Sequence, residues 1–307
     1  MRAPWWLVKP RLGVVLGGGA TLGAFEVGVI SVIARRGIVP DLLVGTSVGA
    51  INAAFWALDP DPGVGERLLE FWLRCDRSTM FPDGAVPMVG RLLQRKDHLT
   101  TQQGLARALQ LAIRADVTFA DTAIPLALTA TVAAHGRRMV LRGGRLLPAI
   151  LASSAIPGLW PAVQIDGIRL VDGGLVANCD LQSAVESGMT DVLAVDVMGD
   201  HLGDESLDIE SILERTAGVV LRRQTELEAE AYGRGIRVAI LRRNSAPQPR
   251  FGDFGLTRQL YRDGQAAAEA FVSAHLGPRR SVKPGIFEWL GAHKVRRAAS
   301  APHMVTA

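Results

Sequence analysis

The chain has 307 residues, enough for one substantial hydrophobic core, and its mean hydropathy of +0.20 excludes a disordered protein. The formal net charge is +4, but residues 277–307 contain six Lys or Arg against one acid, which gives +5 in that segment alone. The remaining body is close to −1 (4 − 5 = −1), so the charge indicates a basic C-terminal segment and argues against a nucleic-acid-binding surface.

The two cysteines, Cys75 and Cys179, lack the spacing of a zinc site or of a disulfide framework, which favours a reducing compartment. The apolar stretch before Lys9 is too short for a secretory signal. Residues 146–163 carry no charge but contain three prolines, which argues against a membrane-spanning helix. We expect a cytoplasmic protein without transmembrane helices, and no metal constellation predicts a cofactor.

The first part of the chain repeats one unit, a short strand followed by a glycine-rich turn and a helix. Residues 12–16 form an apolar run that ends at three glycines, and residues 22–36 then carry apolar side chains at helical spacing. A second strand at 41–44 leads into a turn at 45–49 and a helix over about 50–58.

The rest of the chain continues the alternation of strands and helices. A Pro/Asp breaker at 59–63 precedes a stretch that we interpret as a variable cap. The spacing predicts cap helices at 66–74 and 101–115, a hairpin of strands 124–132 and 138–141, strands at 168–171, 192–197 and 236–241, and helices at 207–231 and 256–276. This alternation predicts an α/β protein with a layered sheet.

The turn Gly45-Thr46-Ser47-Val48-Gly49 lies between a strand and a helix. Glycines at both ends of the turn allow a sharp reversal from which the hydroxyl of Ser47 projects, as in a nucleophile elbow, and the helix directs its amides and positive dipole end at the same place. The alternative is an ordinary strand-to-helix connection that happens to contain a serine. The turn follows only the second strand, whereas the elbow of α/β-hydrolases comes later in the sheet.

Gly17, Gly18 and Gly19 lie between the first strand and its helix, where their amides can converge on an anion. Such a loop either binds the phosphate of a nucleotide or stabilises an oxyanion during catalysis. The spacing to Gly23 misses the dinucleotide fingerprint by one residue, and no P-loop pattern occurs, which argues against nucleotide binding. A tight turn with close helix packing is the simplest alternative.

Asp172 follows the strand at 168–171 and precedes Gly173 and Gly174. This pattern places a carboxylate at the end of a strand, and two small residues directly after it leave space around the carboxylate. By itself it is equally typical of a turn aspartate.

These segments together resemble the patatin-like phospholipase family in order and approximate spacing. The resemblance covers roughly residues 12–197 and rests on G-G-G-A-T-L-G-A-F-E-V-G-V-I, D-L-L-V-G-T-S-V-G-A-I-N-A, A-S-S-A-I-P-G-L-W-P-A-V and L-V-D-G-G-L-V-A-N. It implies a three-layer α/β/α fold with a mostly parallel sheet, a catalytic dyad of Ser47 and Asp172, an oxyanion hole at Gly17, Gly18 and Gly19, and hydrolysis of lipid acyl esters.

On this resemblance we expect a catalytic core over residues 12–200 with a helical cap at about 59–120, an α/β extension of the same domain over 201–276, and a basic tail over 277–307. The chain departs from the family in its glycine loop, which is one residue longer and lacks the usual Arg or Lys. The missing cation removes one electrostatic contribution to the oxyanion site.

We expect Asp172 to accept the proton of Ser47 and an acyl-enzyme to form, which water or a lipid alcohol then resolves, so that an acyltransferase is an alternative. A second alternative is a catalytic triad that includes one of the six histidines. His201 is the best candidate among them because it follows a strand. A catalytically silent lipid-binding or scaffold protein is the rival of another class.

The basic tail contains Ile286, Phe287, Trp289 and Leu290 among its cations. Apolar anchors beside positive charge favour peripheral contact with an anionic membrane surface. The alternative is a basic, partly disordered terminus.

Overall fold

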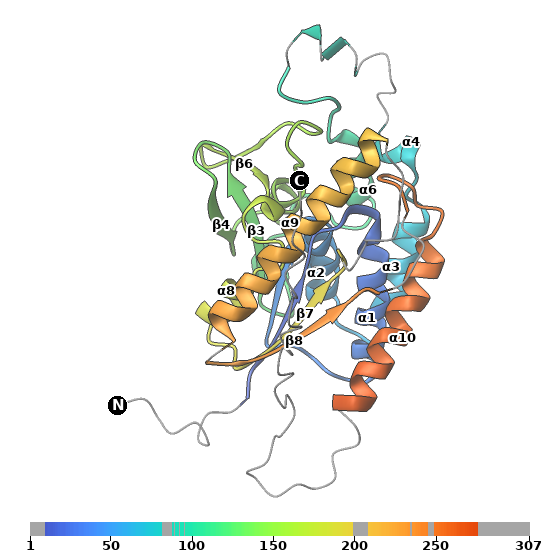
Figure 1. The fold of residues 1–307 in the computed structure, drawn as a ribbon, viewed down its shortest axis with the longest axis vertical. Helices are drawn as coiled ribbons and strands as arrows, with labels where there is room; N and C mark the ends of the chain where they lie inside the picture. Colours follow the sequence, from blue (N-terminus) through green and yellow to red (C-terminus); the bar gives the residue numbers. More distant parts are fainter. Residues whose placement is uncertain are drawn as a thin grey trace, which may run out of the picture.

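The computed structural model describes residues 10–81, 88, 90, 91, 93, 94, 96–198, 208–233, 235–244 and 249–275. Its centre is an eight-stranded sheet with helices on both faces (Figure 1). The strands are β1 (Leu12–Leu16), β2 (Leu42–Thr46), β3 (Leu126–Val132), β4 (Arg137–Leu141), β5 (Val163–Ile165), β6 (Ile168–Asp172), β7 (Asp191–Asp196) and β8 (Arg237–Arg242).

The strand order is β5-β6-β3-β2-β1-β7-β8, and β4 pairs with β3 outside this path. Strands β3, β2, β1, β7 and β8 are mutually parallel, while β4, β5 and β6 are attached through antiparallel pairs. The prediction of a mostly parallel α/β sheet is therefore confirmed. Because the carboxyl ends of parallel strands meet at one edge, the turns that follow β1 and β2 lie next to each other.

Alternate residues of the parallel strands serve two separate cores. Val14 and Leu16 of β1 pack into the larger core, whereas Val15 between them packs into the smaller one. Strand side chains point to opposite faces in turn, so this division identifies the two outer layers. The helices are α1 (Gly23–Arg35), α2 (Val48–Leu58), α3 (Val64–Leu73), α4 (Arg77–Met80), α6 (Gln103–Gln110), α7 (Leu146–Ser153), α8 (Leu181–Glu186), α9 (Ile209–Tyr232) and α10 (Thr257–His275).

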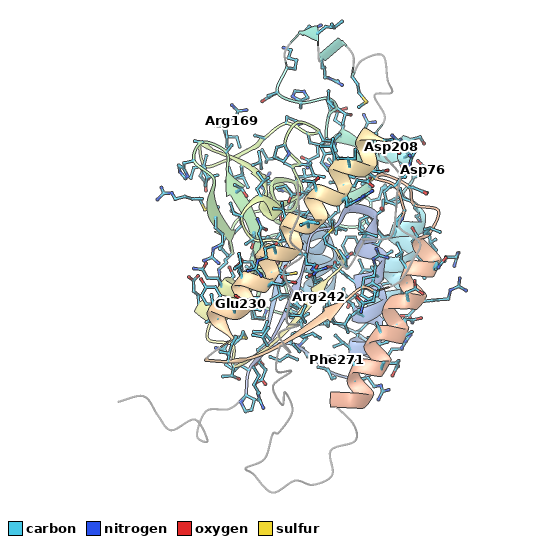
Figure 2. All side chains as sticks on the ribbon, in the orientation of Figure 1. Asp76, Arg169, Asp208, Glu230, Arg242 and Phe271 are labelled. Atoms are coloured by element: carbon cyan, nitrogen blue, oxygen red, sulfur yellow. The ribbon has the colours of Figure 1, made fainter. Side chains whose placement is uncertain are left out.

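The larger core includes side chains of α1, α2, α3 and α10, and the smaller one lies beneath α8 and α9. Helix α9 crosses its face of the sheet diagonally, from its N-cap residue Asp208 to Glu230 near its other end (Figure 2). Helices α1 and α2, which follow the turns after β1 and β2, both pack into the larger core.

The structure confirms most of the expected elements to within one or two residues, among them both strand-turn-helix units and the β3–β4 hairpin. The expected helix at 101–115 is shorter, at Gln103–Gln110. Helices α4, α7 and α8 and strand β5 were not predicted. Pro148 is the third residue of α7, where the amide that proline lacks has no partner inside the helix, so the proline is compatible with the helix start.

No helix in the described part of the chain is both long and apolar enough to cross a bilayer. Cys75 and Cys179 are buried free thiols. Three predictions lie outside the described residues: the membrane-binding tail at 277–307, the N-terminal residues before 10, and His201.

Candidate active site

Ser47 occupies the sharp turn between β2 and α2. Its backbone adopts φ 55° and ψ −122°, a conformation that costs an ordinary residue about 1–3 kcal/mol and is held by the surrounding structure. Gly49 makes the turn possible, because a Cβ atom there would lie 2.2 Å from the carbonyl oxygen of Leu16. The Ser47 side chain therefore projects from the carboxyl edge of the sheet, and only 8% of the residue is exposed.

Two neighbouring hydroxyls fix the backbone of this turn. The amide of Ser47 donates to Ser153 Oγ at 3.0 Å, and Ser153 Oγ donates in turn to the Thr129 carbonyl at 2.6 Å. Ser154 Oγ donates to the Ser47 carbonyl at 3.1 Å. Helix α7 thus ends in two serines that hold the strained residue in place.

Asp172 is the last residue of β6, which joins the sheet through β3. Its Oδ1 accepts a hydrogen bond from the amide of Gly174 at 2.8 Å, and its carbonyl oxygen accepts one from Thr131 Oγ1 at 2.8 Å. Gly173 allows the chain to pass close to β3, since a Cβ there would lie 2.2 Å from the Thr129 carbonyl oxygen. These contacts fix the orientation of the carboxylate.

The structure brings Ser47 and Asp172 together. Ser47 Oγ donates to Asp172 Oδ2 at 2.6 Å, although the residues are 125 positions apart in the chain. Burial raises the pKa of Asp172 to about 6, against the opposing effect of the hydrogen bonds from Ser47 and Gly174. A carboxylate with this pKa is still ionised at neutral pH and is a stronger base than an exposed aspartate.

The glycine loop lies directly beside Ser47. A Cβ on Gly18 would be 3.0 Å from the Ser47 Cβ. The amide of Gly17 donates to the Val195 carbonyl at 3.2 Å, and the amide of Gly18 donates to Asn178 Oδ1 at 3.0 Å. Asn178 also donates from Nδ2 to the Gly18 carbonyl at 3.3 Å, so its side chain clamps the loop from both sides.

Two of the three glycine amides are thus already bonded, whereas the amide of Gly19 has no hydrogen bond to any residue that the structure describes. Val48, the first residue of α2, carries another amide without an acceptor inside its helix.

The described histidines do not contact the two central residues. His98 bonds to Asp97 at 2.7 Å, and His135 lies at the β3–β4 hairpin, where its Nδ1 accepts from Arg137 Nε at 3.3 Å. Within the described part of the chain, the carboxylate of Asp172 bonds to Ser47 and Gly174.

A narrow apolar cavity opens at Ser47, and its walls come from six separate stretches of the chain. Phe81 stacks on Trp160 with ring centroids 5.6 Å apart and lies 5.8 Å from Phe251, while Trp72 stacks on Phe254 at 6.2 Å. These aromatic rings surround the serine with hydrocarbon surface. The other lining residues are Ala20, Thr21, Val48, Ile51, Met80, Leu105, Ser154, Ile156 and Gly252.

A buried polar chain supports this cavity from the side of α1. Trp72 Nε1 donates to Asn52 Oδ1 at 2.9 Å, and Asn52 Nδ2 donates to Glu26 Oε2 at 2.8 Å. Glu26 is completely buried, and burial raises its pKa well above the ordinary value, with the Asn52 hydrogen bond opposing the rise. Glu26 therefore links the helix after the glycine loop to the helix after Ser47.

The sequence did not predict the roles of Ser153, Ser154, Asn178 and Trp160. All four lie in two segments on which the family resemblance rests, A-S-S-A-I-P-G-L-W-P-A-V and L-V-D-G-G-L-V-A-N. The resemblance was therefore the one indication in the sequence that these positions belong to the site. Periodicity and spacing gave no indication of what these side chains contact.

Comparison with known proteins identifies the family of the chain. The sequence model of the patatin-like phospholipase family matches residues 14–185. Lysophospholipase NTE1 of Cryptococcus neoformans var. neoformans is 29% identical over 195 residues, which cover 62% of this chain and 11% of that protein. Neuropathy target esterase sws of Drosophila melanogaster is 26% identical over 197 residues, which cover 62% of this chain and 13% of that protein.

The matched region is thus a small part of these relatives, 11% and 13% of their length. Among solved structures, the crystal structure of VipD from Legionella pneumophila is similar with a TM-score of 0.44 and 13% sequence identity, and the match covers 87% of this chain and 68% of that one.

Proposed function

Since the chain belongs to the patatin-like phospholipase family, we propose that it hydrolyses acyl esters of lipids, with Ser47 as nucleophile and Asp172 as general base. The observation that carries the proposal is the hydrogen bond of 2.6 Å from Ser47 Oγ to Asp172 Oδ2 in a largely apolar site. A serine hydroxyl is a weak nucleophile unless a base removes its proton during attack. Asp172 is the base in direct contact with it.

In the proposed reaction, Asp172 takes the proton of Ser47 while the serine oxygen attacks the ester carbonyl. The tetrahedral intermediate collapses when the protonated carboxyl returns the proton to the leaving alcohol, which leaves the acyl group on Ser47. Asp172, ionised again, then removes a proton from water, which attacks the acyl-enzyme and releases the fatty acid. One carboxylate serves both halves of the cycle.

The oxyanion needs donors that are fixed and unoccupied. The amides of Gly17 and Gly18 already have protein acceptors, so we assign the oxyanion donors to the amides of Gly19 and Val48. Asn178 has a positioning role, because it clamps Gly18 in the middle of the loop. The positive end of α2 adds to the stabilisation of the developing charge.

The cavity at Ser47 favours an acyl chain over a polar acyl group, because rings of Trp72, Phe81 and Phe254 line it. Burying apolar surface stabilises a complex by about 25 cal/mol per Å². The relatives reported above include a protein named lysophospholipase, and a lipid with a single acyl chain fits a narrow cavity. We therefore propose a lysophospholipid as the substrate class.

The test is labelling with a fluorophosphonate, which reacts with activated serines, together with hydrolysis of lysophosphatidylcholine. We expect wild-type protein to be labelled and active, Ser47→Ala to lose both properties, and Asp172→Asn to lose about 99% of both, since a general base contributes about 100-fold or more to the rate. Ser78→Ala, on exposed helix α4, is the matched serine control and keeps both. Wild-type protein that is folded but neither labels nor turns over would instead indicate a silent member of the family.

A further inference from the structure

The outer face of helix α9, which points away from the sheet, carries much exposed apolar surface. Five aliphatic residues of this helix are between 45% and 63% exposed, namely Ile212, Leu213, Val219, Val220 and Leu227. Spacings of seven and eight residues return to the same side of a helix, so the five side chains form one stripe. The helix lies in front of the sheet between Asp208 and Glu230 in Figure 2. A contiguous apolar stripe, unlike a single exposed side chain, marks an interaction surface.

This outer face carries almost no charge. The other exposed residues between positions 212 and 227 are Thr216, Ala217 and Arg223. The two acids of the stretch are only partly exposed and have partners elsewhere: Glu214 accepts from the amide of Phe251 at 2.7 Å, and Glu226 accepts from Arg222 at 3.1 Å. The outer face therefore presents one cation and no acid to a partner.

Helix α9 is attached to the proposed active site at two points. Near its start, Glu214 holds the amide of Phe251, and Phe251 lines the Ser47 cavity. Further along, Gln224 Nε2 donates to the carbonyl of Leu175 at 3.0 Å. Leu175 is the third residue after Asp172 and is itself 55% exposed. A partner bound to the outer face of α9 thus lies next to the loop that follows the proposed base.

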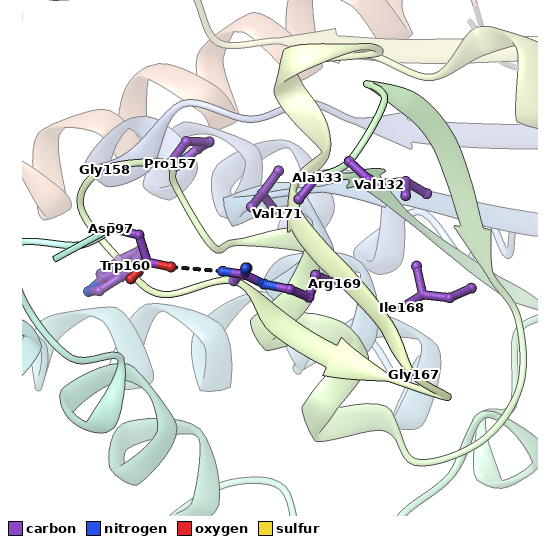
Figure 3. Close-up of a pocket in the computed structure, with 12 residues that line it drawn as sticks. Asp97, Val132, Ala133, Pro157, Gly158, Trp160, Gly167, Ile168, Arg169 and Val171 are labelled. Atoms are coloured by element: carbon purple, nitrogen blue, oxygen red, sulfur yellow. Dashed lines mark hydrogen bonds and ion pairs between the residues drawn. The ribbon is translucent and has the colours of Figure 1, made fainter.

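The surface beside β6 has a different character. Figure 3 shows a cavity of about 510 Å³ there, with Arg169 joined to Asp97. Arg169 Nη2 lies 2.8 Å from Asp97 Oδ2, and both side chains are more than half exposed. Transfer of an exposed ion pair into hydrocarbon costs free energy, because both charges lose their hydration. The outer face of α9 is therefore the better surface for an apolar partner.

The dimensions of the stripe favour a lipid surface over a second copy of the chain. From Ile212 to Leu227 the stripe is about 22 Å long at 1.5 Å per residue, and a helix is about 10 Å wide. The product, about 220 Å², is well below the roughly 800 Å² per partner of a standard protein–protein interface. One apolar helix face is sufficient, however, for shallow insertion between lipid head groups and acyl chains.

We propose that the outer face of α9, together with Leu175, binds the surface of a lipid aggregate. Its aliphatic side chains would lie at the boundary between head groups and acyl chains, with the Ser47 cavity beside them. The choice of partner rests on the proposed function, because a lipid hydrolase takes its substrate from such an aggregate. This surface is separate from the segment at 277–307, whose membrane contact stays a prediction.

Vesicle binding tests this surface without turnover. All proteins carry Ser47→Ala so that the lipid stays intact, and vesicles of dioleoylphosphatidylcholine have no net charge, which removes electrostatic attraction to basic segments. Cosedimentation measures the partition coefficient. The test variant combines Leu213→Gln with Val220→Gln, because glutamine favours a helix and adds no charge. The matched control combines Leu111→Gln with Val39→Gln, the same residue types at exposed sites outside α9.

We expect the α9 variant to lower the partition coefficient at least about tenfold, since two aliphatic side chains no longer move from water into hydrocarbon. The control variant should bind like the parent protein. With Ser47 restored, the α9 variant should keep kcat/KM for a water-soluble butyryl ester, and its activity on lipid in vesicles should fall by the same factor as binding. This difference between the two substrates separates a loss of docking from a loss of folded protein.

The assignment is overturned if the parent protein does not bind the vesicles, or if the two pairs of substitutions lower binding equally. It is also overturned if light scattering shows a dimer that only the α9 variant dissociates, because a second copy then covers the outer face. Failure of the proposed function looks different: vesicle binding then depends on α9, but wild-type protein cleaves neither lysophosphatidylcholine nor the butyryl ester.

Discussion

The backbone amide of Ser47 donates a hydrogen bond to the hydroxyl of Ser153, and that hydroxyl donates a hydrogen bond to the Thr129 carbonyl of β3. We expect Ser153→Ala to lower the free energy of unfolding by about 1–3 kcal/mol, because a buried amide and a buried carbonyl each lose a partner. We also expect kcat to fall, since the strained turn is no longer held. Urea denaturation and steady-state kinetics measure the two effects.

The control is Ser187→Ala, whose hydroxyl bonds to a carbonyl within its own helix end and is remote from the turn. A Ser153→Ala variant that loses stability while keeping full kcat would show that the hydrogen bond supports the fold only.

The pKa of Asp172 sets the pH dependence of the proposed reaction. Burial raises it to about 6, and the base must be ionised to accept the serine proton. We therefore expect kcat/KM to rise about tenfold per pH unit below pH 6 and to level off above it. A profile that stays flat down to pH 4 would exclude Asp172 as the base.

The same raised pKa predicts how stability depends on pH. The folded state holds the Asp172 proton more tightly than the unfolded state, whose carboxyl has a pKa of about 3.9. Stability contributed by the protonated group is therefore lost as pH rises from about 4 to 6, by roughly 3 kcal/mol in total.

Asp172→Asn keeps an acceptor for the Gly174 amide and carries no charge. We expect this variant to be more stable than wild type at pH 8 and about equal to it at pH 4, as measured by urea denaturation at both values. A variant that is less stable at pH 8 would mean that the hydrogen bonds of the carboxylate outweigh its desolvation.

Local sequence patterns were sufficient to predict the sharp turn at Ser47, but not the contact of Ser47 with Asp172. The glycines at 45 and 49 and the flanking apolar runs predict a strand, a sharp turn and a helix, and the structure has these elements. The contact between Ser47 and Asp172 depends on β6 pairing with β3, which spacing does not encode. The family resemblance implied the contact between Ser47 and Asp172, and the pairing of β6 with β3 was not predicted.

The glycine loop shows what a motif leaves undetermined. Three consecutive glycines predict amides that converge on an anion, and the predicted oxyanion hole at Gly17, Gly18 and Gly19 is not tested here; of these three we propose only Gly19 as a donor. The structure adds that two of these amides bond to Val195 and Asn178. Both partners come from segments far along the chain, so the sequence of the loop itself could not reveal them.

Glu26 is a buried acid, and its burial should have a measurable effect on the free energy of unfolding. Burial raises its pKa well above the ordinary value, and its Oε1 has no hydrogen-bond partner among the residues that the structure describes. Since a raised carboxyl pKa means that the folded state binds more protons, stability falls as pH rises, by about 1.4 kcal/mol per pH unit between the unfolded and folded pKa values.

Glu26→Gln removes this titration and retains an oxygen acceptor for Asn52 Nδ2. We expect the stability of Glu26→Gln relative to wild type to increase between pH 5 and pH 8 in urea denaturation. Equal differences at the two pH values would show that Glu26 does not titrate in this window.

Phe81 stacks on Trp160 and contacts Phe251 at the wall of the Ser47 cavity. Its replacement by Ala removes apolar surface along which a long acyl chain would lie, whereas a butyryl group is too short to reach it. We expect Phe81→Ala to lower kcat/KM for a palmitoyl ester at least about tenfold relative to a butyryl ester of the same alcohol, since burying a large apolar side chain is worth about 1.5–3 kcal/mol. Leu111→Ala, at an exposed site outside the cavity, is the control and should leave the ratio unchanged. Using the ratio cancels any loss of folded protein, so an equal fall for both esters would mean that the aromatic wall does not bind the acyl chain.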